Sequence, residues 1–276
     1  MNCGAYTLYA IEDGWIMRHP AEVFPDVEPD LWPPGDLIDG MLRVTWGCFL
    51  LTDGSRTVLV DTGMGPLAAS LPGDRQAVAG QLPQALAMIG VRPDDVQVVV
   101  HTHLHVDHCG GNLTPNGSPL FPNAEFRVHR TELDFWLHES TVPAAPAVQG
   151  VMQPLIDAGQ VEPVDGETDV APGVRLVETP GHTPGHVSVV VTSQGTRTFI
   201  AGDVSHHPNQ IPHPDWVSVF DLDPAQALRT RERVFEQVTG TGTVFAAGHY
   251  PPPGIGYIEM DDRKRIFVPG TAVQVA

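Results

Sequence analysis

Residues 101–111 read HTHLHVDHCGG, and this stretch decides how the rest of the chain is interpreted. It follows directly on VQVVV, a short apolar run that is typical of a buried strand. In an extended segment His103 and His105 point the same way, because side chains alternate with a period of two. A turn after them brings Asp107 and His108 round to the same point. Imidazole and carboxylate groups at this spacing predict a metal site, with zinc, iron, nickel and copper all compatible.

Three later side chains have the same placement at the end of a predicted strand. His182 comes just after VRLVETP, Asp203 ends TRTFIAGD, and His249 ends TVFAAGH. Taken singly, each is equally compatible with an exposed loop histidine or a turn aspartate. A sheet brings the ends of neighbouring strands to one edge, so together with the first cluster they predict a shared metal site.

Groups of strands alternate with a few helices along the chain. Asp53-Gly54 favours a hairpin turn between the first two strands, and Asp223 with Pro224 favours a helix start. The predicted strands are 41–52, 55–63, 96–100, 124–130, 174–180, 186–193, 196–203, 243–249, 257–260 and 265–270. The predicted helices are 74–90, 130–140, 151–159 and 223–240. This order predicts two packed sheets with helices outside, an α/β fold, rather than a regular βαβ alternation.

Composition limits the domain count, the partners and the compartment. The chain has 276 residues without a low-complexity linker, so we expect a single domain over residues 1–276. Its 15 basic and 33 acidic residues give a net charge of −18, which argues against nucleic acid or an anionic membrane as partner. No apolar run approaches the ~18 residues of a membrane span. The first residues lack the pattern of a signal peptide, and three cysteines in unrelated contexts do not suggest disulfides, so we expect a cytoplasmic protein.

The first forty residues show little regular pattern. Within them, HPAEVFPDVEPDLWPPGD at 19–36 is rich in proline and carries Phe24 and Trp32. Two interpretations remain open, an irregular surface segment or the wall of a pocket. IPHPDWVSVFD at 211–221 is also rich in proline and follows soon after Asp203, so we expect it at the rim of the same pocket.

With these motifs in place, the sequence resembles the metallo-β-lactamase superfamily over nearly its whole length. HTHLHVDHCGG contains the HxHxDH signature of that family. DTG at 61–63, TPGH at 179–182, GD at 202–203 and GH at 248–249 follow in the family's order. The resemblance implies an αββα sandwich of two mixed β-sheets flanked by helices.

The resemblance also implies a pair of divalent metal ions, with zinc as the first expectation and iron, manganese or cobalt as alternatives. It assigns one metal to His103, His105 and His182, the other to Asp107, His108 and His249, and the bridging position to Asp203. Asp61 would brace the ligand loop, and His186 would support the site from behind.

Within the family, the chain looks most like the lactonases that open acyl-homoserine lactones. Asp203 stands where β-lactamases proper usually carry Cys, and GDVSHHPNQIPHPDW is also similar to hydrolases of the methyl-parathion type. The implied reaction is attack of a metal-bridging hydroxide on the carbonyl of a small lactone or other carboxylic ester. Asp203 would hold the metals, and Asp107 would carry the proton to the leaving alkoxide.

Two other activities remain open, and the chain differs from the lactonase pattern at one position. The same centre could hydrolyse phosphotriesters, or one iron ion could support a thiol or persulfide dioxygenase, although the second ligand set speaks against the latter. Lactonases of this group commonly carry a Tyr shortly after the bridging Asp, whereas this chain has His206 and His207 there. Either histidine could polarise the substrate carbonyl or support the ligands. The sequence leaves the oligomeric state open, with a homodimer possible.

Overall fold

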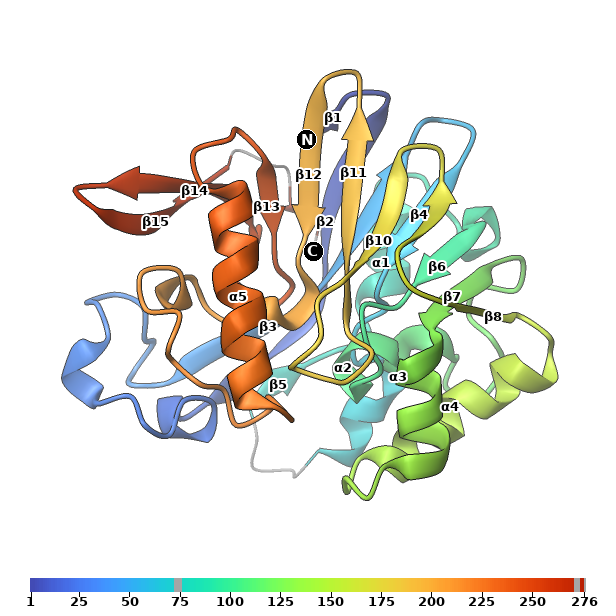
Figure 1. Ribbon diagram of the computed structural model, residues 1–276. Helices are drawn as coiled ribbons and strands as arrows, with labels where there is room; N and C mark the ends of the chain where they lie inside the picture. Colours follow the sequence, from blue (N-terminus) through green and yellow to red (C-terminus); the bar gives the residue numbers. More distant parts are fainter. Residues whose placement is uncertain (72–75, 271–273, 276) are drawn as a thin grey trace.

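Two β-sheets packed face to face form the centre of the molecule in the computed structural model, which describes residues 1–71, 76–270 and 274–275 (Figure 1). The first sheet comprises β1 (Asn2–Cys3), β2 (Tyr6–Arg18), β3 (Leu42–Thr52), β4 (Thr57–Val60), β5 (Ala77–Val78), β6 (Val98–Val100), β7 (Glu125–His129), β8 (Val161–Val164) and β16 (Gln274–Val275). Its order is β1-β2-β3-β4-β6-β7-β8, with β5 and β16 paired to β2. Strands β1 to β4 pair antiparallel, and β4, β6, β7 and β8 pair in parallel.

The second sheet is antiparallel except for one parallel pair. It comprises β9 (Thr168–Ala171), β10 (Val174–Glu178), β11 (Val187–Ser193), β12 (Thr196–Ile200), β13 (Val244–Ala246), β14 (Ile255–Asp261) and β15 (Lys264–Pro269). Its order is β15-β14-β13-β12-β11-β10-β9, and β12 pairs with β13 in parallel. Both sheets are therefore mixed, as the family resemblance implies.

Helices cover the outer faces of both sheets (Figure 1). They are α1 (Leu82–Met88), α2 (Val106–Cys109), α3 (Arg130–Asp134), α4 (Ala145–Asp157) and α5 (Pro224–Val238), and a π-helical turn (Phe135–Glu139) continues α3. Short 3₁₀ turns lie at Pro20–Glu22, Pro29–Leu31, Gly65–Ser70, Pro93–Asp95, Gly110–Asn112, Gly202–Val204 and Pro208–Gln210. Among the described residues, no helix is both long enough and apolar enough to span a bilayer.

Three apolar layers hold the sandwich together. Leu51 and Val189 belong to the core between the two sheets. Leu86 of α1 and Met152 of α4 pack with the outer side of the first sheet, and Phe235 of α5 packs against the second. The order helix, sheet, sheet, helix confirms the predicted αββα architecture, which the burial of apolar surface stabilises.

Two predictions about local structure were wrong in part. The first forty residues include β2, a strand of 13 residues, whose period-two pattern is hidden by a shift in pairing between Glu12 and Gly14. The predicted helix over 74–90 starts only at Leu82, because Ala77–Val78 pairs with β2 as β5. Residues 74 and 75 of that prediction lie outside the described residues.

The predicted ligands follow the ends of strands in both sheets, and these strand ends lie at one edge of the sandwich. His103 and His105 follow β6, His182 follows β10, Asp203 follows β12, and His249 follows β13. Strands β12 and β13 run in parallel, and β10 runs in the same direction as β12 because each pairs antiparallel with β11. Their ends therefore meet at the same side of the sandwich.

Candidate metal centre

A first group of ligand atoms comes together from the loops after β6, β10 and β12. His103, His105, His182 and Asp203 each offer one ligand atom, and these atoms lie within 4.8 Å of one another. His105 Nδ1 is 3.0 Å from His103 Nε2 and 2.8 Å from His182 Nε2. His182 Nε2 lies 3.3 Å from Asp203 Oδ2. The structure thus brings these four side chains together.

A second group lies beside the first. Asp107, His108 and His249 also offer ligand atoms within 4.8 Å of one another, with the two Nε2 atoms 3.3 Å apart. Asp203 contacts this group too, because Oδ2 lies 3.1 Å from His249 Nε2 and Oδ1 lies 3.3 Å from His108 Nε2. Asp203 is thus the carboxylate shared by both groups.

The donor set fits divalent cations. Nitrogens bound ~2.0–2.1 Å from a tetrahedral zinc lie about 3.3 Å apart, close to the separations found here. His103 and Asp203 are almost completely buried, and Asp203 Oδ1 has no hydrogen-bond partner among the described residues. A buried carboxylate oxygen without a partner is costly, and a cation would satisfy it.

Asp61 makes hydrogen bonds to the loop that carries the candidate ligands. It accepts hydrogen bonds from Thr102 N, Thr102 Oγ1 and His108 Nδ1, each at 2.8 Å. Burial raises the pKa of Asp61, but His108 and His101 outweigh it and bring the pKa to about 2. The ionised carboxylate therefore fixes the ring orientation of His108 and leaves Nε2 directed at the site.

Asp221, which the sequence analysis did not assign, braces His182 in the same way. Its Oδ1 accepts from His182 Nδ1 at 3.0 Å, and its Oδ2 accepts from Arg231 at 3.1 Å. On the other side, the carbonyl oxygen of Thr45 accepts from His249 Nδ1 at 2.7 Å. The only sequence signal for Asp221 was its place in the segment expected at the pocket rim.

Glu132 is a second functional side chain that the sequence did not reveal. It is fully buried and accepts hydrogen bonds from Leu104 N (3.0 Å), Trp136 Nε1 (2.6 Å), Thr183 Oγ1 (2.8 Å) and Gly185 N (3.0 Å). Burial raises the pKa of Glu132, and these four donors oppose the rise. One carboxylate thus joins the loop of His103 and His105 to the loop of His182.

His186 supports Asp203 through the backbone. Its Nε2 accepts a hydrogen bond from Asp203 N at 2.9 Å, and its Nδ1 lies 2.9 Å from Thr179 Oγ1. Burial, followed by the charge of His182, lowers the pKa of His186 to about 3, so the ring is neutral. His186 thus contacts the backbone of Asp203 and does not belong to either group of candidate ligands.

His206 and His207 have different surroundings. His206 lies with its Nε2 3.4 Å from Asp203 Oδ2 and its ring stacked on His249, yet neither ring nitrogen has a hydrogen-bond partner among the described residues. His207 turns away, accepts from Asn209 N at 3.2 Å, and packs its ring on Trp32. Only His206 is therefore placed to contact a ligand.

A cavity of about 250 Å³ opens over the metal cluster. Asp107, Asp203, His206 and His249 line its floor, and the walls are mainly apolar. Both interpretations of segment 19–36 hold in part: most of it is exposed and irregular, but Val23 lines the cavity, and Phe24 and Trp32 pack behind it with Trp216. Phe220 lines the cavity as well, which confirms the predicted place of residues 211–221.

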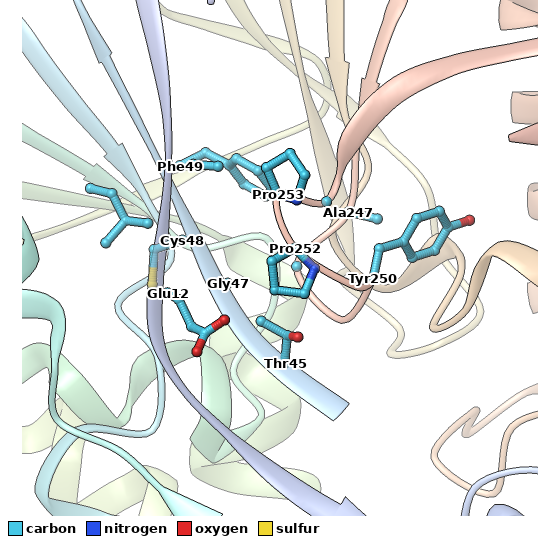
Figure 2. Close-up of a pocket in the computed structure, with 13 residues that line it drawn as sticks. Glu12, Thr45, Gly47, Cys48, Phe49, Ala247, Tyr250, Pro252 and Pro253 are labelled. Carbon is cyan, nitrogen blue, oxygen red and sulfur yellow. The ribbon is translucent and has the colours of Figure 1, made fainter. Parts of the chain in front are cut away.

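Figure 2 shows a second hollow, between β3 and the turn that carries Pro252 and Pro253. Its volume of about 10 Å³ is enough for roughly one water and too small for a substrate. Gly47 N donates to Gly248 O at 3.0 Å there, and a Cβ on Gly47 would lie 2.7 Å from that oxygen. The glycine pair lets the two segments approach closely enough for His249 to reach Thr45.

The fold and the site together define a metal-binding αββα protein. Residues 48–249 match the family model described as the Metallo-beta-lactamase superfamily, and the chain belongs to that superfamily.

Relatives within the superfamily include N-acyl homoserine lactonases. An N-acyl homoserine lactonase, AiiA, of Bacillus thuringiensis subsp. kurstaki is 30% identical over 240 residues, which cover 82% of this chain and 87% of the relative. The structure of AidC, described as a dizinc quorum-quenching lactonase, aligns with a TM-score of 0.87 over 99% of this chain and 97% of that one. At 21% sequence identity, this alignment shows that the two proteins share a fold. The hydrolase AbOPH aligns with a TM-score of 0.86 at 25% identity over 98% of this chain and 97% of that one.

Proposed function

We propose that this protein is a hydrolase of lactones or other carboxylic esters that works with two divalent metal ions, zinc first among them. One observation carries the proposal: two adjacent ligand groups share Asp203 at the floor of a mainly apolar cavity. The similarity to N-acyl homoserine lactonases supports the substrate class.

We assign the ligands as follows. One metal would be held by His103, His105 and His182, and the second by Asp107, His108 and His249, with Asp203 available to both. Two divalent cations held there supply Lewis acidity toward a carbonyl oxygen and lower the pKa of a coordinated water. Asp61 and His186 keep their partners in place and do not contact the substrate.

Two side chains of the cavity floor act on the substrate. The side chain of Asp107 is 25% exposed, in contrast to the nearly buried Asp203, so its carboxylate can take up the proton of the attacking water and pass it to the leaving alkoxide. The ring nitrogens of His206 have no hydrogen-bond partner among the described residues, and the ring N–H donates to the carbonyl oxygen as negative charge develops there. His207 packs on Trp32 and takes no part in this step.

The test combines metal content with turnover. Elemental analysis of the purified protein should give close to two metals per chain, and a panel of an N-acyl homoserine lactone, an aryl ester and a phosphotriester should show hydrolysis of the lactone or ester. Asp203→Ala should lose both metals and most activity, whereas His138→Ala, at an exposed histidine outside the site, should retain them. One iron per chain with oxygen uptake on thiols, or turnover of the phosphotriester alone, would contradict the proposal.

A further inference from the structure

Among the described residues, the cavity wall contains one charged side chain apart from the candidate metal ligands. Around it the lining is apolar, with Val23, Val44, Trp46 and Phe220 among the residues that form the wall. The exception is Arg18, the last residue of β2. In ligand pockets of this kind, a few placed polar groups on an apolar wall determine orientation and specificity.

Arg18 is held in position from two sides. Its backbone pairs with Leu42 of β3, and its guanidinium carbon lies 5.7 Å from the ring centroid of Phe220. The side chain is half-buried, and within residues 1–71, 76–270 and 274–275 it has no hydrogen bond and no carboxylate oxygen within 4.0 Å. The N–H donors of this guanidinium are therefore free for a ligand.

Arg43 provides a comparison on the neighbouring strand. It also lies over an aromatic ring, 5.3 Å from the centroid of Trp15, but its guanidinium pairs with Glu12 at 2.7 Å and donates to Thr45 Oγ1 at 3.0 Å. Arg43 does not line the cavity. Arg18 and Arg43, on adjacent strands, thus both lie over an aromatic ring. Of the two, Arg43 has a carboxylate partner, whereas Arg18 in the cavity has none among the described residues.

We propose that Arg18 is a specificity-determining residue that binds a carboxylate on the acyl part of the substrate. The proposal rests on the proposed function and narrows it to esters or lactones with a scissile carbonyl, an apolar body and a terminal carboxylate. The planar guanidinium matches both oxygens of a carboxylate, and such charge-assisted bonds are stronger than bonds to neutral acceptors. The apolar wall covers the body of the substrate between its two polar ends.

Three 4-nitrophenyl esters of equal acyl length test the proposal: the hexanoate, the adipate monoester with a free carboxylate, and its methyl ester. Wild-type protein loaded with metal should have the highest kcat/KM for the free carboxylate. Arg18→Gln should lower that kcat/KM by about 10- to 100-fold and leave the hexanoate within about twofold. Arg43→Gln, the matched control, should keep the wild-type preference.

A second measurement needs no variant. If Arg18 binds the carboxylate, raising ionic strength should reduce the preference of the wild type for the free acid over the hexanoate, because salt screens the pair. Equal losses on all three esters in Arg18→Gln, or a wild type that favours the methyl ester or the hexanoate, would overturn the inference and leave the proposed hydrolase intact. Hydrolysis of no ester or lactone at all would overturn both.

Discussion

Among single residues, His207 is a case in which burial alone sets the protonation state of a side chain. It is 3% exposed and packs on Trp32, and burial lowers its pKa from 6.5 to about 3. In the unfolded chain the ring takes up a proton as the pH falls through 6.5, whereas the folded chain resists protonation until about pH 3. The free energy of unfolding therefore decreases as the pH falls through this window.

His207→Asn should flatten that dependence. Asn can replace Nδ1 as the acceptor for Asn209 N, and it does not titrate. Between pH 6.5 and 5 we expect the slope of the unfolding free energy against pH to decrease by up to about 1.4 kcal/mol per pH unit, the value for one proton. Urea unfolding at a series of pH values measures this difference, and parallel slopes for the two proteins would contradict it.

At the scale of loops and helices, Glu132 connects two ligand segments that are far apart in sequence. It accepts from Leu104 N between His103 and His105, and from Gly185 N in the segment that carries His182. All three of these histidines belong to the first ligand group, whereas Asp61 braces the second group through His108. Asp61 also reaches the first group, because Thr102 Oγ1 donates to it and lies 3.1 Å from His103 Nδ1, whereas the contacts of Glu132 with ligand segments involve the first group alone.

Glu132→Gln should weaken the first group selectively. The amide keeps the size of the side chain but replaces one acceptor oxygen with a donor that faces one backbone N–H and one side-chain donor. Removing such a supporting contact typically costs 10- to 100-fold in metal affinity, so we expect one metal per chain to be lost at a lower chelator concentration than the other.

Asp13→Asn is the control for this variant. Asp13 is equally buried and accepts from Gly65 N and Leu82 N, but it contacts neither ligand segment. Metal content after dialysis against graded chelator separates the cases. Simultaneous loss of both metals from Glu132→Gln, or the same behaviour in Asp13→Asn, would show that Glu132 has only a general structural role.

Elements and ligands could be predicted where the signal is local. The candidate metal ligands lie in short sequence motifs, HTHLHVDHCGG and the strand ends at His182, Asp203 and His249. The structure brings these side chains together. Strand β2 was not predicted, because the shift in its pairing with β3 breaks the alternation of buried and exposed residues. The contacts of Glu132 and Asp221 were not predicted, because their partners come from distant segments of the chain. A carboxylate inside a helix pattern normally indicates an exposed position.

For the whole molecule, the ligand groups connect the two sheets. The histidines after β6 belong to the first sheet, whereas His182, Asp203 and His249 follow strands of the second. Each proposed metal contacts ligands from both sheets, and the apolar core between the sheets ends at the same edge. Metal binding should therefore add to the cohesion of the sandwich as well as to catalysis.

Removal of the metals should lower the thermal stability of the entire chain in one step. A ligand at a thousandfold excess over its dissociation constant stabilises the folded state by about 4 kcal/mol, and each kcal/mol shifts the Tm of a domain of this size by roughly 2–4 °C. One metal therefore corresponds to a Tm difference of about 10 °C, so we expect a chelator that removes both metals to lower Tm by about 20 °C and added zinc to restore it. Calorimetry with parallel metal analysis checks this, and we expect a single transition, since residues 1–276 are proposed to form one domain. A Tm that stays constant while the metals leave would show that the sandwich does not depend on them, and two separate transitions would contradict the single domain.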